Sequence, residues 1–343
     1  PFRPSASRQG AAMSAACEAE DFGAALKTSA DDPSLDLPAS RPTVAYAAKI
    51  AQLGLRGFLQ HACDQGAGFS TLSLAENAIG DAGVQVLCDV MSGNPFLRRL
   101  NLHDTGIGHN GFEKLGGLLQ ACPQIEVLVL SGNRPGDAPL PDAFCSAVAA
   151  APALRALQLS SCGLDEACLR PLFEALCKRN LCGLAPLERL TLSRNRIAGL
   201  KAAELCGVLA ASGVLEGLDL SANSLGPAGG EALAQRLHGV ESCGLRRLSV
   251  DANGLELRGC RALVRLWNSP SGPSLEHLDL RENGLSEGNC TELSRMLGKE
   301  LGSVLQLGGG RRVMLSWRDR QAVMSRKAHG GHEPMNIYWH DRD

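Results

Sequence analysis

The sequence predicts an α/β solenoid in which parallel strands line a concave face and helices form the convex face. Three observations support this fold class. A short motif returns eight times at a nearly constant interval, its leucines alternate with variable residues as in a strand, and helical spacing follows each copy. Only 4% of the 343 residues are aromatic whereas 44% are hydrophobic, so we expect a core of Leu, Ala, Val and Cys built from many small units.

The repeated motif reads L-x-x-L-x-L-x-x-N, from FSTLSLAEN at 69–77 to LEHLDLREN at 275–283. Its closing residues are 28, 28, 29, 33, 28, 30 and 30 positions apart. An Asn at this place can hydrogen-bond backbone groups of its own and the neighbouring coil, where a bend leaves them unpaired, and Thr or Cys is a weaker substitute. The predicted Asn ladder consists of Asn77, Thr105, Asn133, Cys162, Asn195, Asn223, Asn253 and Asn283.

A helix is predicted after each closing residue. Val84, Leu87 and Met91 have helical spacing, and Pro227 follows Gly226 where a helix would start. Each unit is therefore strand, bend, helix and return. One unit cannot bury its own apolar face, but stacked units bury a continuous core.

This unit of 28–30 residues resembles the ribonuclease-inhibitor-like class of leucine-rich repeat. The class is shared with NOD-like receptor arrays, the Ran GTPase-activating protein and tropomodulins. The resemblance covers about residues 44–307 and identifies the class far better than any single family. It implies a horseshoe of about eight repeats.

The two ends depart from the repeat pattern. Residues 1–40 are rich in Ala, Ser and Pro and are expected to form a disordered or loosely ordered arm, with a transit peptide as the alternative. Residues 41–68 are expected to form a helical cap through Ile50, Leu53 and Phe58. The repeats then occupy 69–307.

Residues 308–343 are expected to form a C-terminal cap and a basic, aromatic tail. Val313, Leu315 and Trp317 would cover the last repeat, and Tyr338 and Trp339 lie near the chain end. Aromatic residues and Arg are frequent interface anchors, so Trp317, Tyr338 and Trp339 are candidates for partner binding, with a flexible end as the alternative.

Two repeats carry irregular segments. Three prolines in the segment after Asn133 predict a remodelled loop with Arg134 and Asp137 as candidate partner contacts, and an insertion occupies 177–186. Insertions in a solenoid emerge at its edge, where they either bind partners or are simply tolerated.

The remaining composition excludes several classes. The net charge of −2 gives no general signal for nucleic acid, apart from a weakly basic C-terminal tail, and no apolar run is long enough to span a membrane. Thirteen scattered cysteines without a CxxC motif indicate reduced thiols in a cytoplasmic compartment, with organellar, cytoskeletal or ciliary association as alternatives. Catalytic motifs are missing, and the spacing of the tail histidines is a weak metal signal. We therefore expect no catalytic residue, cofactor, metal or small-molecule substrate.

Strand alternation predicts which side chains point outward from the concave face. Near its C-terminal end this face is expected to gather Asp219, Asp251, Asp279, Arg247, His277 and Arg281. A binding patch and an ordinary solvated surface both remain open. No aromatic residue occupies the outward positions, which counts against ribonuclease-inhibitor-like activity.

The leading functional prediction is a non-enzymatic protein-interaction scaffold or structural subunit of a larger intracellular assembly. Binding would use the concave face, the edge loops and the C-terminal tail. One alternative is a GTPase-activating protein resembling the Ran regulator, with Arg98, Arg99 and Asn101 as an edge constellation. Another is the repeat fragment of a NOD-like receptor, which would require an upstream nucleotide-binding domain.

Overall fold

A computed structural model describes most of the repeat region. The described residues are 54–57, 59, 70–92, 94–179, 187–199, 201, 206, 215–239, 243–269, 271–273, 275–296, 305–307, 311–313 and 323–325. The predicted N-terminal arm, Phe58, Trp317, Tyr338 and Trp339 lie outside them. Among the helices so described, none has the length and apolar character needed to cross a membrane.

Eight parallel strands form one sheet in sequence order, which confirms the predicted α/β horseshoe. The central leucine of each strand is directly paired in register with that of the next, from Leu72 to Leu278. The strands are β1 (Thr71–Ser73), β2 (Arg99–Asn101), β3 (Val127–Val129), β4 (Ala156–Gln158), β5 (Arg189–Thr191), β6 (Gly217–Asp219), β7 (Arg247–Ser249) and β8 (His277–Asp279).

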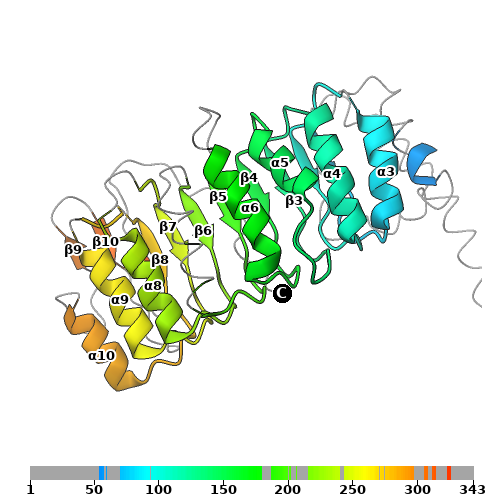
Figure 1. The fold of residues 1–343 in the computed structure, drawn as a ribbon. Coiled ribbons are helices and arrows are strands. Elements are labelled where there is room, and N and C mark those ends of the chain that lie inside the picture. Colours follow the sequence, from blue (N-terminus) through cyan, green and yellow to red (C-terminus); the bar gives the residue numbers. More distant parts are fainter. Residues whose placement is uncertain are drawn as a thin grey trace, which may run out of the picture.

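The helices lie side by side on the opposite side of the array from the sheet (Figure 1). Those described are α3 (Gly80–Met91), α4 (His109–Ala121), α5 (Asp142–Ala150), α6 (Glu166–Arg179), α8 (Gly226–Leu237), α9 (Glu256–Asn268) and α10 (Glu287–Met296). The predicted helical positions Val84, Leu87 and Met91 are fully buried, and Pro227 stands in the first turn of α8 as expected.

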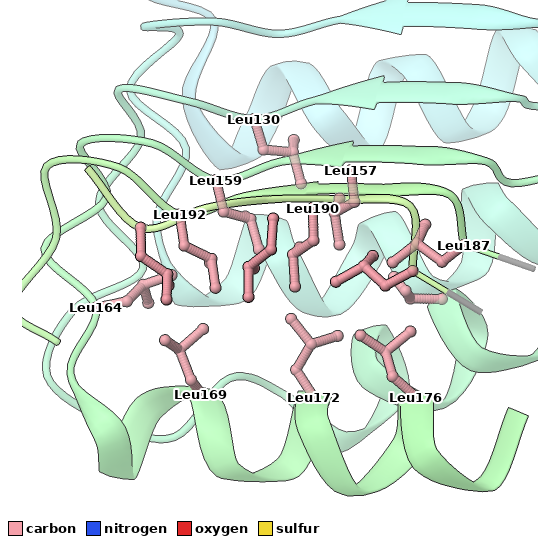
Figure 2. Close-up of a cluster of buried hydrophobic side chains, with 14 of the residues drawn as sticks. Leu130, Leu157, Leu159, Leu164, Leu169, Leu172, Leu176, Leu187, Leu190 and Leu192 are labelled. Carbon is pink, nitrogen blue, oxygen red and sulfur yellow. The ribbon is translucent and has the colours of Figure 1, made fainter. Parts of the chain in front are cut away.

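The core is a layer of leucines between strands and helices. Figure 2 shows Leu157, Leu159, Leu190 and Leu192 from the strand side facing Leu172 and its neighbours on α6. The four strand-side leucines are fully buried. Helices α4 and α5 add an aromatic contact, in which the rings of Phe112 and Phe144 meet edge to face with centroids 5.2 Å apart. The periodic leucines therefore supply most of the interior, and Val, Ile, Met, Cys and Phe side chains complete it.

The two ends of the sheet differ. Residues 54–57 and 59 are helical next to the first repeat, and Leu59 is fully buried in the core. At the other end, β9 (Leu305–Leu307) and β10 (Arg311–Val313) form an antiparallel pair, while β11 (Val323–Ser325) joins the main sheet antiparallel to β8. The strand β11 thus covers the edge of the last described parallel strand, and the covering role assigned to Val313, Leu315 and Trp317 stays a prediction.

The irregular repeats keep the fold by local compensation. The prolines after Asn133 delay the helix, so α5 begins only at Asp142 and has 9 residues. The buried Arg179, which is 2% exposed, lies near the start of the predicted insertion and donates to the carbonyls of Val148 (2.8 Å), Ala151 (2.7 Å) and Leu154 (3.0 Å). One side chain thereby satisfies a carbonyl in the last turn of α5 and carbonyls of the segment that follows the helix.

The predicted Asn ladder is present, and it joins successive coils. The Asn223 oxygen accepts the amides of Asn195 (3.2 Å) and Ile197 (3.1 Å) in the preceding coil. Its amide nitrogen donates to the carbonyls of Leu192 (3.0 Å) and Leu220 (2.8 Å). The same arrangement recurs at Asn133, Asn195 and Asn283.

The Cys162 substitution coincides with a missing donor. Cys162 offers no oxygen to the preceding coil, and in that coil Pro135, which has no N–H, stands where Ile107 and Ile197 present theirs. The other amide, that of Asn133, bonds to the Leu130 carbonyl at 3.4 Å, and the Cys162 thiol donates to the same carbonyl at 3.4 Å. The weaker side chain therefore suffices at this coil.

At Thr105 the preceding coil supplies the acceptor that an Asn would have provided. The Ile79 amide, which an Asn at 105 would bind, donates instead to the Asn77 carbonyl at 2.7 Å. The Thr105 hydroxyl donates to the Leu102 carbonyl at 2.8 Å.

The residue before each ladder position has a left-handed backbone. This was not predicted from the sequence, because most of these residues are not glycine. Their φ angles lie between 48° and 78° at Glu76, Asp104, Gly132, Ser161, Arg194, Ala222, Ala252 and Glu282. Left-handed backbone costs about 1 kcal/mol for residues with a Cβ, so the bend stores some strain in almost every coil.

Replacing a central ladder residue should destabilise the array strongly. Asn223→Ala leaves the amides of Asn195 and Ile197 without their acceptor and removes one of two side-chain donors from the carbonyls of Leu192 and Leu220. We expect the free energy of unfolding to fall by about 3–5 kcal/mol. The control is Asn77→Ala, because the Asn77 amide donates only to Leu74 and Ala75 of its own coil and its loss should cost about 1 kcal/mol. Chemical denaturation measures both; equal losses would contradict the inter-coil role.

Relieving the left-handed strain should stabilise the protein. Ala222→Gly and Ala252→Gly should each raise the free energy of unfolding by about 0.5–1 kcal/mol, because glycine adopts positive φ without a Cβ clash. Gly132→Ala should act oppositely, since its new Cβ would lie 3.2 Å from the Asp104 backbone. Thermal denaturation of the three variants checks the sign, and destabilisation by both Ala→Gly changes would be inconsistent with strain at the bend.

Candidate functional site

The concave face consists of three rows of side chains that run across the strands. Alternation directs these residues away from the leucine layer. Row one contains Thr71, Arg99, Val127, Ala156, Arg189, Gly217, Arg247 and His277. Row two contains Ser73, Asn101, Val129, Gln158, Thr191, Asp219, Ser249 and Asp279. Row three contains Ala75, His103, Ser131, Ser160, Ser193, Ser221, Asp251 and Arg281.

The structure places the three predicted concave aspartates on adjacent coils but gives them little exposure. Asp219, Asp251 and Asp279 are only 6%, 7% and 3% exposed. Of the two alternatives left open for this face, an ordinary solvated surface does not describe these three buried positions, and their role in binding stays a prediction. The alternation correctly placed the side chains on the face, but their accessibility depends on packing that the repeat pattern does not encode.

Asp279 and Arg281 form the strongest contact in this group. The Arg281 Nε lies 2.9 Å from both carboxylate oxygens of Asp279, and Nη2 lies 2.5 Å from Oδ2. These hydrogen bonds raise the pKa of Arg281. A guanidinium held by its own neighbour orients that carboxylate and removes one positive charge from the set available to a partner.

Asp219 carries its negative charge unfavourably. Burial raises the pKa of Asp219 to about 6, and the nearby Asp251 and Asp279 add to the rise. The Ser221 amide opposes it by donating to Asp219 Oδ1 at 2.9 Å. A carboxylate that weakens the folded state at neutral pH is a feature frequently associated with functional sites.

The predicted edge residues Arg134 and Asp137 lie in the loop between β3 and α5. Arg134 is exposed, and the exposed Asp137 pairs with Arg196 from two coils further on at 3.0 Å. This pair is almost fully solvated, so it contributes little to stability. Arg134 and Asp137 are thus accessible, but they lie apart from the concave aspartates.

The three residues suggested for GTPase activation do not form one free group. Arg98 pairs with Glu126 of the next coil at 2.6 Å, whereas Arg99 and Asn101 lie in rows one and two. Equivalent pairs join Arg155 to Glu188 and Arg246 to Glu276 along the same edge. Arg98 is thus part of a structural edge series.

The cysteines with described side chains are free thiols that are buried or half-buried. The side chains of nine cysteines are described, and none of these nine is in a disulfide. Burial raises the pKa of Cys145, Cys162 and Cys206 to about 12, and every other shift resolved for the described cysteines is also upward. A raised pKa disfavours the nucleophilic thiolate. Within the part of the chain that the structure describes, no group of His, Cys, Asp or Glu is arranged to hold a metal.

Comparison with known families identifies the repeats. Models described as leucine-rich repeat match residues 69–88, 214–234 and 274–296, which contain the first, sixth and eighth copies of the motif. Together with the parallel sheet and the Asn ladder, they define a leucine-rich-repeat protein.

The curated relatives narrow this class. Mouse (Mus musculus) ribonuclease inhibitor is 33% identical over 204 residues, covering 52% of this chain and 44% of its own length. The pig (Sus scrofa) ribonuclease inhibitor is 31% identical over 211 residues, covering 61% and 43%. The cattle (Bos taurus) NACHT, LRR and PYD domains-containing protein 3 is 31% identical over 147 residues, covering 42% and 14%. The repeats are of the ribonuclease-inhibitor-like class, and the chain spans less than half the length of these relatives.

The raised pKa of Asp219 predicts a pH-dependent stability. Because the folded pKa lies above the unfolded value near 4, the protonated form stabilises the fold, and this contribution is lost as pH rises from about 4 to 6. Asp219→Asn should therefore raise the free energy of unfolding at pH 7 by up to about 3 kcal/mol, and by much less at pH 4.

Denaturation at several pH values measures the difference between Asp219→Asn and the parent protein. The exposed Asp137→Asn provides the control, and its difference from the parent should be small throughout. A flat difference for Asp219→Asn would show that the carboxylate is not destabilised by burial.

Proposed function

We propose that this protein is a non-enzymatic protein-interaction scaffold that binds through the C-terminal half of its concave face, with the edge loops and tail as additional contacts. The observation that supports this most is Asp219, whose buried charge the fold does not require. The equivalent position holds the small polar residues Thr191 on β5 and Ser249 on β7. On β6 it holds Asp219, whose carboxylate weakens folding at neutral pH.

A protein fits this surface better than other ligand classes. The face extends across eight strands and mixes carboxylates with guanidinium groups, whereas a nucleic acid would be repelled by the aspartates. Leucine-rich-repeat proteins are generally binding modules. The concave rows contain no Phe, Tyr or Trp, so any tight binding would rest on charge complementarity or on the predicted aromatic anchors Trp317, Tyr338 and Trp339.

The cysteine environments favour a reducing compartment such as the cytoplasm, because nine free thiols would be exposed to oxidation elsewhere. Within such a compartment the rigid array would serve as a fixed component of a larger assembly. Organellar or cytoskeletal association is compatible with this role.

Affinity capture with quantitative mass spectrometry tests the proposal. The full chain should recover a stoichiometric partner, and Asp219→Asn with Asp251→Asn should reduce its recovery by about tenfold or more. A matched control, Glu231→Gln with Arg258→Gln, removes an exposed pair of charges on helices α8 and α9, away from the concave face and the edge loops, and should leave recovery unchanged.

A third protein that ends at Ser325 retains β11 and therefore the described edge of the sheet. Comparison with the full chain measures the contribution of Tyr338 and Trp339 without disturbing β8. The scaffold proposal fails if no protein recovers a stoichiometric partner, or if the concave and control variants recover it equally.

A further inference from the structure

Gly217 on β6 has no structural reason to be glycine. Its φ is not in the left-handed region, and a Cβ built on it would meet only the Arg189 Cγ, at an ordinary 3.7 Å. By contrast, Gly230 would place its Cβ 2.9 Å from the Gly259 Cα, so the packing of α8 against α9 requires that glycine. Glycine within a strand weakens it and often marks a bulge or the close approach of a ligand.

A bulge does not explain this glycine. Gly217 pairs in continuous register with Arg189 on β5 and with Arg247 on β7. The backbone at position 217 could accommodate a larger side chain. We therefore attribute the glycine to the close approach of a ligand.

The two arginines beside Gly217 differ from their neighbours. Neither Arg189 nor Arg247 has an ion-pair or hydrogen-bond partner for its guanidinium in the described part of the chain, whereas Arg155, Arg246 and Arg281 are each paired. Both are partly exposed. Their Cα atoms lie about 10 Å apart, two strand spacings, with only Gly217 between them.

Two guanidinium groups on either side of a bare strand position can converge on one oxyanion. The planar guanidinium presents its N–H donors in a fork that matches a carboxylate. The stem of Arg189 leans toward Gly217, and His277 continues the same row beyond Arg247. A larger side chain at 217 would occupy the space in which the anion would lie.

We propose that Arg189, Gly217 and Arg247 form a notch that binds the carboxylate of an Asp or Glu side chain from a protein partner. This rests on the proposed function and specifies the chemistry of the partner. A single carboxylate suits the notch better than a polyanion, because the exposed Glu216 adjoins it and Asp219 and Asp251 lie further along the same strands. A run of phosphates would meet these carboxylates.

Direct binding of a defined peptide tests the notch. The probe is a fluorescein-labelled, C-terminally amidated peptide with one central Glu among Gly and Ser residues, and its binding is followed by fluorescence anisotropy at low ionic strength. Arg189→Gln with Arg247→Gln should weaken binding by about tenfold or more, because both donors to the carboxylate are lost. The matched control, Arg155→Gln with Arg246→Gln, removes the same charge from two arginines in ion pairs and should change affinity less than about twofold.

Filling the notch provides a test that is independent of charge. Gly217→Val should weaken peptide binding by a similar factor, while its melting temperature stays equal to or above that of the parent because valine favours strands. Unchanged affinity in this variant or in the Arg189/Arg247 pair would overturn the proposal. Equal weakening by the Arg155/Arg246 control would also do so, since it would indicate general charge attraction.

A single-stranded oligonucleotide of matched length distinguishes the source of the anion. Tighter binding of the oligonucleotide, with the same dependence on Arg189 and Arg247, would assign the notch to phosphate and overturn the carboxylate proposal. Failure here is separable from failure of the scaffold function. If a captured partner still binds the Arg189/Arg247 variant, the notch proposal is overturned and the scaffold proposal stands. If no partner is captured, the scaffold proposal is overturned, and the peptide experiment still tests the notch.

Discussion

The structure depends on satisfying the backbone where each strand bends toward its helix. At this bend two amides of one coil and leucine carbonyls of two coils face the interior, and one carboxamide supplies an acceptor and donors for them, as at Asn223. Leaving a buried backbone group unpaired costs about 1–3 kcal/mol, and this penalty would recur at each coil in a fold whose net stability is typically about 5–15 kcal/mol. The ladder position is therefore constrained although the repeat length varies.

The two departures show that the constraint concerns donors and acceptors more than residue identity. Cys162 is tolerated where Pro135 removes one of the amides that an Asn would bind, and Thr105 is tolerated where Ile79 finds its acceptor at Asn77. Neither compensation can be recognised from the ladder residue alone, because each depends on the coil before it. Once the coils are stacked in register, both become consequences of the same pattern of hydrogen bonds.

This dependence on stacking explains what the sequence could predict. The ladder, the buried leucines and the order of strands follow from a period repeated eight times, so each copy supports the others. The antiparallel addition of β11, the cap that Arg179 forms on α5 and the burial of Asp219 occur once each and have no periodic signal. The notch at Gly217 was missed for a related reason: it is defined by an absent side chain and by unpaired neighbours on two other coils.

The closed interior leaves the concave rows free to vary without affecting the fold. In the third and fourth coils these rows hold Val127, Val129 and Ala156, whereas from the fifth coil onward they hold guanidinium and carboxylate groups. The cations of row one stand at the strand starts and the carboxylates stand further along, which gives this half of the face a direction across the strands. A partner segment of mixed charge would then be oriented as well as held, since reversing it would place like charges together. Specificity can arise in this way on a face without aromatic side chains, because charge order along the strands selects the orientation.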